Sequence, residues 1–201
     1  MKISAKMVAE LRARTGAGMM DCKKALTEVD GDVDQAIQLL REKGLRASEL
    51  KSSREASEGI IVSYIHPGNR IGAMVEINCE TDFVARTDVF QDLAKNIAMQ
   101  IAASKPRYLE RKEVPQEVID SEKAILKQQD DIQGKPDHII GRIVEGRLDK
   151  FYTEVCLLEQ TFIRDNDKTI DQIVKESIAQ LGENIVINRF ALYVLGQSNA
   201  Q

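Results

Sequence analysis

The sequence has little of the chemistry that would tie it to a metal or to a disulfide framework. Its 201 residues contain three cysteines, two histidines and no tryptophan. Cys22, Cys79 and Cys156 are widely spaced among apolar neighbours and form no C-x-x-C pair, so we expect small buried thiols. His66 and His138 have no ligand-type spacing to each other or to a cysteine. We therefore expect no metal site and no cofactor.

Long hydrophobic runs are also missing. No stretch approaches the roughly 18 apolar residues that span a bilayer, and the first four residues lead into an amphipathic segment instead of the apolar region of a signal peptide. The net charge of -4 and the pI of about 5.4 disfavour a general nucleic-acid binder, because such a chain displaces few counterions from phosphates. We expect a cytoplasmic protein with no membrane partner and no direct nucleic-acid partner.

Catalytic motifs are absent as well. The sequence has no glycine-rich phosphate loop, no serine, histidine and acid set in a motif context, and no recognisable pair of catalytic carboxylates. Its 43% hydrophobic and 30% charged residues are those of an ordinary folded domain. These features favour a partner-binding factor that is not an enzyme and has no small-molecule substrate.

Residues 1–45 are expected to form a three-helix bundle. Apolar spacing predicts helices at 5–14, 19–29 and 33–43, separated by glycine-containing turns. A bundle of this size encloses too little core to hold a substrate and is better suited to docking on another protein. Residues 46–58 are rich in charge and serine, and we expect a linker or a solvated helix there.

Residues 59–201 are expected to form an α+β core. Apolar residues alternate on both sides of a turn at 66–70, which indicates a β-hairpin, and Thr87 can cap a helix that ends near Ser104. A helical hairpin is expected at about 114–155, then a capped helix that stops at Gly182 and a last strand over 185–195. The predicted fold class is thus α+β: an N-terminal bundle, then a small antiparallel sheet covered by helices, with a helical hairpin.

The sequence Asn-Cys-Glu-Thr-Asp-Phe-Val-Ala-Arg at 78–86 marks the corner where a predicted strand gives way to a helix. Thr81 is a plausible N-cap, and Asp82 would lie in the first turn, where a carboxylate suits the helix dipole. Phe83 then has two interpretations. It either folds back as a hydrophobic staple into its own core or is displayed to a partner.

Two long stretches resemble signatures of the elongation factor Ts family. They are Leu-Arg-Ala-Arg-Thr-Gly-Ala-Gly-Met-Met-Asp-Cys-Lys-Lys-Ala-Leu at 11–26 and Glu-Ile-Asn-Cys-Glu-Thr-Asp-Phe-Val-Ala-Arg at 76–86. The segments Leu157–Gln160, followed by Phe162, and Gly182–Ile185 are similar to further family segments. The resemblance therefore covers essentially the whole chain.

This resemblance implies a guanine nucleotide exchange factor that binds elongation factor Tu. The bundle would be of the ubiquitin-associated type and would dock on the nucleotide domain of that partner. Its docking segment would comprise Arg14, Thr15, Gly16, Ala17, Gly18, Met19 and Met20. The element pressed near the partner's nucleotide site would comprise Thr81, Asp82, Phe83, Val84 and Ala85. Asp82 and Phe83 would disturb the groups that hold magnesium and phosphate, so that GDP leaves and GTP later displaces the factor.

Longer members of that family carry two core sheet subdomains, whereas this chain has room for one. It therefore resembles the short form, in which a homodimer would supply the core twice. The expected seam involves Gly59–Ile65 and the last strand, and it would be non-covalent because residues 185–195 contain no cysteine. Two alternatives stay open from the residues alone: an adaptor or scaffold that binds another partner without exchange activity, and an enzyme with an unrecognised site.

Overall fold

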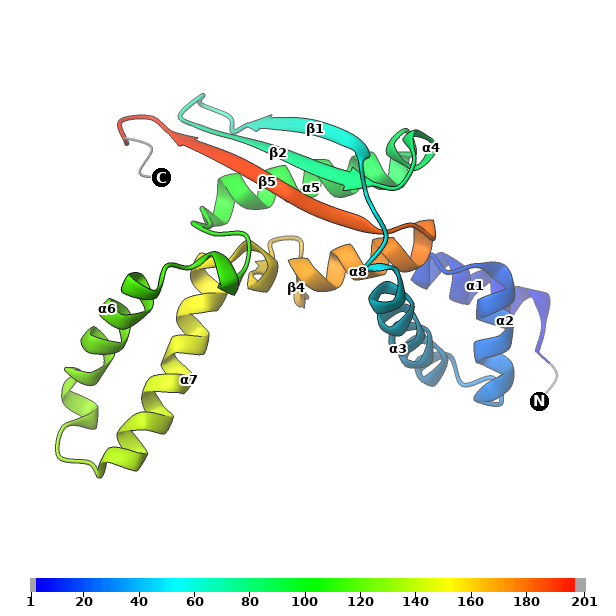
Figure 1. Ribbon diagram of the computed structural model, residues 1–201. Helices are drawn as coiled ribbons and strands as arrows, with labels where there is room; N and C mark the ends of the chain where they lie inside the picture. Colours follow the sequence, from blue (N-terminus) through cyan, green and yellow to red (C-terminus); the bar gives the residue numbers. More distant parts are fainter. Residues whose placement is uncertain (1–2, 198–201) are drawn as a thin grey trace. The chain divides into compact units, whose positions relative to one another are not determined.

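A computed structural model describes residues 3–197 and shows helices combined with a small antiparallel sheet (Figure 1). The helices and strands are α1 Ala5–Thr15, α2 Met19–Glu28, α3 Val33–Lys51, β1 Glu58–Ile65, β2 Ile71–Cys79, α4 Asp82–Ala85, α5 Asp88–Ser104, α6 Gln116–Lys127, α7 Asp137–Val155, β3 Thr161–Phe162, β4 Asp165–Thr169, α8 Ile170–Leu181 and β5 Ile185–Val194. Short 3-10 turns lie at Arg111–Glu113, Asp130–Ile132 and Leu157–Glu159. The predicted α+β class is confirmed.

The chain forms two compact units. The first contains the residues up to Ile61 together with Glu76–Ala94 and Gln172–Asn188. The second contains Val62–Val75, Lys95–Asp171 and the residues from Arg189 onward. The candidate docking segment and the corner at 78–86 both belong to the first unit.

Helices α1, α2 and α3 form the predicted N-terminal bundle. Ser4 caps α1 by accepting a hydrogen bond from the Met7 backbone N–H at 3.2 Å, and the Asp32 carboxylate caps α3 through the Gln35 N–H at 2.9 Å. The core of the bundle consists of Val8, Leu11, Cys22, Ala25, Leu26 and Ala36, all buried. The amphipathic spacing read from the sequence is therefore what closes the bundle.

The sequence suggested that helix α3 ends at Gly44, but the helix runs past this residue. It continues to Lys51, so the first half of the expected linker at 46–58 is helical and carries the buried Ser48. Gly44 allows close packing: a Cβ atom on it would lie 3.1 Å from the Cβ atom of Ala179. Packing against α8 thus overrides the weak helix-stop signal of a single glycine.

The three-stranded sheet has the order β1-β2-β5, and α5 runs along one face of it (Figure 1). The expected hairpin turn is present, with the His66 N–H donating to the Ile71 carbonyl oxygen at 2.9 Å. Thr87 caps α5 by accepting from the Phe90 N–H at 3.3 Å. The buried apolar residues of β2 and α5 include Ala73, Val75, Ile77, Cys79, Phe90, Leu93, Ala94, Ile97 and Ile101.

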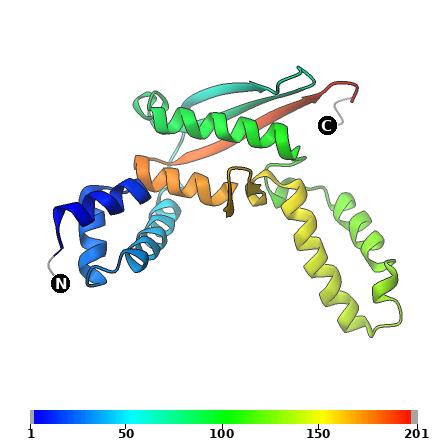
Figure 2. The same cartoon turned by 180° about the vertical axis from the view of Figure 1, so that it is seen from behind.

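Helices α6 and α7 run side by side as the expected helical hairpin, which has its own apolar core (Figure 2). That core includes Leu126, Ile132, Val144, Leu148 and Tyr152. The small hairpin of β3 and β4 that follows was not foreseen, because β3 has only two residues and the five residues of β4 are all polar, so neither strand shows an apolar alternation.

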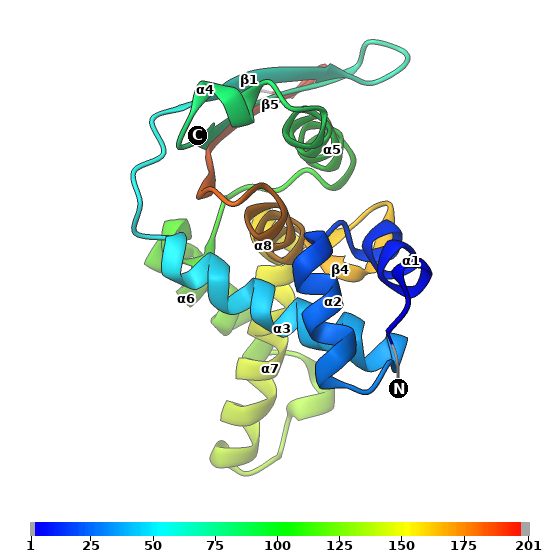
Figure 3. The same ribbon diagram turned by 90° about the vertical axis from the view of Figure 1, so that its right-hand side faces the viewer.

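Helix α8 lies beside the N-terminal bundle (Figure 3). A Cβ atom on Gly16 would lie 3.1 Å from the side-chain nitrogen of Gln180, which places the end of α1 against the last turn of α8. Gly182 ends α8 in the left-handed region, with φ of 83°. The chain then enters β5 through Glu183 and Asn184.

Candidate functional site

The corner between β2 and α4 is built around Thr81, which is the N-cap of a helix of only four residues. Its backbone is extended, with φ of -132° and ψ of 153°, and its hydroxyl accepts a hydrogen bond from the Val84 N–H at 3.4 Å. The cap that the sequence predicts is confirmed. The turn that follows sets the direction of the side chains at 82 and 83.

Phe83 points into solvent with 78% of its surface exposed. The staple interpretation is therefore wrong. The buried positions beside the corner are occupied by Ala85 and Phe90 instead. Thr81, Asp82 and Val84 are half-buried, which leaves Phe83 as the one bulky apolar group that the corner displays.

Asp82 lies in the first turn of α4 and forms an ion pair with Arg86 one turn later, at 2.7 Å. Both side chains are substantially exposed. An exposed pair of this kind contributes less than about 1 kcal/mol, so the carboxylate of Asp82 remains available to a partner.

The corner is held from the far end of the chain by Glu183. One carboxylate oxygen accepts from the Thr81 backbone N–H at 3.0 Å, and the other accepts from the Thr81 hydroxyl at 2.7 Å. Both residues are half-buried. The sequence showed Glu183 only as part of a family-like segment and gave it no role.

A second set of contacts joins the same two segments. The Asn184 N–H donates to the carboxylate of Glu80 at 2.6 Å, and the Asn184 side chain donates to the Arg54 carbonyl oxygen at 2.8 Å. The bond from Asn184, helped by the Arg54 guanidinium, holds the pKa of Glu80 below its ordinary value. Burial and the nearby Glu183 raise the pKa of Cys79, whose thiol donates to the Thr81 carbonyl oxygen at 3.1 Å.

The predicted docking segment lies at the junction of α1 and α2. The Thr15 hydroxyl donates to the Leu11 carbonyl oxygen at 2.8 Å and accepts from the Ala17 N–H at 3.3 Å, which fixes the junction. Met19 and Met20 at the start of α2 are 45% and 61% exposed. The segment therefore presents flexible apolar side chains on a rigid turn.

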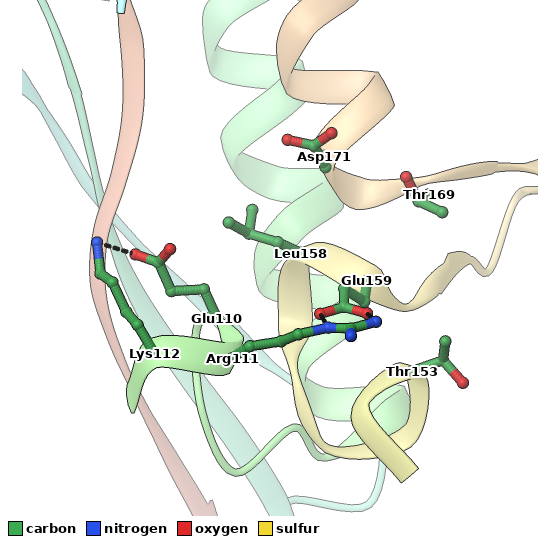
Figure 4. Close-up of a pocket in the computed structure, with 8 residues that line it drawn as sticks. All are labelled: Glu110, Arg111, Lys112, Thr153, Leu158, Glu159, Thr169 and Asp171. Carbon is green, nitrogen blue, oxygen red and sulfur yellow. Dashed lines mark hydrogen bonds and ion pairs between the residues drawn. The ribbon is translucent and has the colours of Figure 1, made fainter. Parts of the chain in front are cut away.

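A hollow of about 550 Å³ lies elsewhere, in the second unit (Figure 4). Its lining residues are Glu110, Arg111, Lys112, Thr153, Leu158, Glu159, Thr169 and Asp171. The central Arg111 binds Glu159 with two hydrogen bonds of 2.5 and 2.6 Å, and these raise its pKa. Lys112 is paired with Glu110. The cations of this hollow are thus paired with its own carboxylates.

Within residues 3–197, no cluster of His, Cys, Asp and Glu has the arrangement of a metal site. Of the helices in this described range, none is both long enough and apolar enough to cross a membrane.

Comparison with known proteins agrees with the geometry. Residues 2–197 match the family model described as Elongation factor TS. The chain belongs to the elongation factor Ts family. Elongation factor Ts of Syntrophomonas wolfei subsp. wolfei is 60% identical over 195 residues, which cover 97% of this chain and 91% of the relative. That of Desulforamulus reducens is 58% identical, over 98% of this chain and 90% of the relative. Elongation factor Ts of Caldanaerobacter subterraneus subsp. tengcongensis is also 58% identical, over 97% of this chain and 98% of the relative.

Membership in the elongation factor Ts family makes this chain a translation elongation factor. It also gives the corner and the exposed methionines a context.

Proposed function

We propose that this chain is the guanine nucleotide exchange factor of elongation factor Tu and that it works without chemical conversion of a substrate. The observation that carries the proposal is the exposure of Phe83 on a corner that is capped and clamped. A large aromatic group held in water at 78% exposure forgoes burial worth about 1.5–3 kcal/mol. An aromatic side chain held on a fixed corner favours a role at a partner interface, because aromatic residues are enriched at interface hot spots.

The exchange step follows from the needs of a nucleotide-bound magnesium ion. Mg²⁺ demands near-ideal octahedral geometry and bridges the terminal phosphates in P-loop GTPases. Phe83 and Asp82 lie at the tip of the corner, where they would press on the partner elements that support this ion. A small displacement of those supports weakens the hold on GDP.

Thermodynamic linkage then sets the direction of the cycle. If the factor weakens nucleotide binding to elongation factor Tu, nucleotide weakens binding of the factor by the same free energy. GDP therefore leaves the ternary complex faster, and incoming GTP expels the factor. The factor itself needs no preference between the two nucleotides.

The bundle supplies affinity. Met19 and Met20 are exposed on α2, and methionine is enriched at protein interfaces because its flexible side chain fits irregular surfaces. The segment from Arg14 to Met20 would dock on the nucleotide domain of elongation factor Tu, while the corner disturbs the phosphate region.

A homodimer is part of the proposal. β1 and β5 are the outer strands of the sheet, and exposed strand edges tend to be paired or covered. On β1, within the expected seam, Ile61 and Ile65 are 63% and 58% exposed, while Ile60, Val62 and Tyr64 are half-buried. The seam would thus rest on apolar burial, and it would place two corners on one particle.

The deciding experiment is release of fluorescent GDP from purified elongation factor Tu, with and without this chain. We expect substoichiometric amounts of the chain to accelerate GDP release, with a rate that rises with the concentration of the chain. Added GTP should dissociate the complex. Binding without acceleration would support the adaptor alternative. No binding at all would refute both.

A further inference from the structure

Helix α4 is too short to hold its own shape. A four-residue helix makes hardly more than the first hydrogen-bonded turn, and that turn is the costly nucleation step of a helix. The direction of Phe83 therefore depends on whatever fixes the first residues of α4. Thr81, the N-cap, is the residue through which such support must act.

The residues of α4 and its N-cap provide only half of a capping box. In a capping box, the N-cap hydroxyl accepts from the N3 backbone N–H, and a Glu or Gln at N3 reaches back to the N-cap N–H. Here the first half is present, from Val84 to Thr81. Position N3 is Val84 itself, so the returning carboxylate is missing from α4.

Glu183 supplies that carboxylate from 102 residues away. It accepts the Thr81 N–H at 3.0 Å, which completes the box, and it also accepts the Thr81 hydroxyl proton at 2.7 Å. The hydroxyl then has its hydrogen directed to Glu183 and a lone pair directed to Val84. Bonds to an ionised acceptor are about twice as strong as neutral ones, so Glu183 fixes the rotamer of the cap.

Glu183 is itself held on both sides. Gly182 ends α8 just before it, and the buried Asn184 just after it is fastened to Glu80 and Arg54. In the last turn of α8, Gln180 lies against Gly16 of the docking segment. Within one unit, the segment that carries Glu183 therefore lies between a contact with the docking segment and the capped corner.

We propose that Glu183 is a positioning residue for nucleotide exchange: it completes the capping box of α4 and so fixes the direction in which Asp82 and Phe83 meet the partner. This inference rests on the proposed exchange function. It predicts that loss of the carboxylate lowers the exchange rate of the bound complex more than it lowers binding, because the docking segment is untouched.

The test compares Glu183→Gln with wild type in GDP release from elongation factor Tu, over a range of factor concentrations. Glutamine has one carbonyl oxygen and can satisfy one of the two Thr81 donors. We expect the maximal release rate to fall about tenfold, the equivalent of one weakened charge-assisted hydrogen bond. The concentration for half-maximal release should change less than about twofold. Glu145→Gln, which removes a carboxylate from the exposed pair with Lys123, is the matched control and should match wild type.

Thr81 provides the second arm. Thr81→Ser keeps the hydroxyl and should retain most of the maximal rate, while Thr81→Val removes it and should resemble Glu183→Gln. Combining Thr81→Val with Glu183→Gln should lower the rate by less than the product of the two single effects, because both act on one contact. Hydrogen exchange of the peptide covering 80–86 should accelerate in Glu183→Gln.

Three results would overturn the assignment. One is a maximal rate for Glu183→Gln within twofold of wild type. Another is multiplicative effects in the double variant. A third is a rate that falls only in proportion to the fraction of folded protein. If wild type itself fails to accelerate release, the proposed exchange function is refuted, and the assignment falls with it.

Discussion

Phe83 and Phe90 lie seven residues apart on either side of one turn, and their environments are opposite. Phe83 is 78% exposed at the tip of the corner, whereas Phe90 is completely buried on α5. One short segment thus contains one exposed phenylalanine and one buried phenylalanine.

Alanine substitutions should separate the two positions. Phe83→Ala should change the free energy of unfolding by no more than about 0.5 kcal/mol, as at other exposed sites, while stimulated GDP release falls strongly. Phe90→Ala should cost about 3–5 kcal/mol because it leaves a cavity in the core. Denaturant unfolding and GDP release, measured on the same preparations, check both. A large stability loss for Phe83→Ala together with normal exchange would refute the role of Phe83.

The exposed methionines of α2 give a prediction about docking. Met20→Gln should weaken binding to nucleotide-free elongation factor Tu by about tenfold, because apolar contact at an interface centre is lost. Leu50→Gln is the control, since Leu50 is 81% exposed on α3 of the same bundle and lies outside the docking segment. Isothermal titration calorimetry gives both affinities. If Met20→Gln and Leu50→Gln bind with equal affinity, the docking surface lies elsewhere.

Acid below about pH 4.5 should loosen the corner through Glu80. Its pKa is lowered in the folded protein by the Asn184 N–H and by Arg54, so its stabilising contribution is present above the unfolded-state value of about 4.5 and is lost as the pH falls through the folded value. Glu80→Gln should remove this part of the pH dependence. Thermal melts between pH 3 and pH 7 measure this dependence. If the melting temperature changes with pH identically in wild type and in Glu80→Gln, the prediction is contradicted.

The cysteines should be unreactive in the native protein. Cys22, Cys79 and Cys156 are all buried, and burial raises the pKa of Cys156 to about 11, so little of the reactive thiolate forms at neutral pH. We expect three thiols to react with a disulfide reagent at once in denaturant and only slowly without it. A thiol that reacts within seconds in native protein would show that its segment opens readily.

The proposed homodimer has its own test. Ile61→Lys on β1 should shift sedimentation equilibrium at micromolar concentration from dimer to monomer, because it places a charge in an apolar seam. Ile125→Lys on α6 changes an isoleucine of similar exposure, 55% against 63%, and should leave the dimer intact. A wild-type chain that is monomeric throughout would show that one core suffices.

Much of the fold was predictable because it depends on local patterns. The bundle helices, the hairpin of β1 and β2, the capped α5 and the last strand each carry a hydrophobic period with stop signals at their ends. The boundary at Gly44 was not predictable, since a glycine that permits close packing on Ala179 and a glycine that ends a helix look alike in sequence. The hairpin of β3 and β4 was not predicted, because β3 has two residues and β4 has no apolar residue.

The sequence by itself determined that residues 81–85 would form a capped corner, because Thr81 and the acidic first turn are local signals. Only the tertiary structure decided where Phe83 points. Its direction depends on which side chains already fill the core, and on a carboxylate at position 183 that reaches Thr81 only after α8 has packed. Hydrogen bonds across 102 residues have no periodicity that a sequence can display, so the support of the corner becomes visible only once the chain has folded.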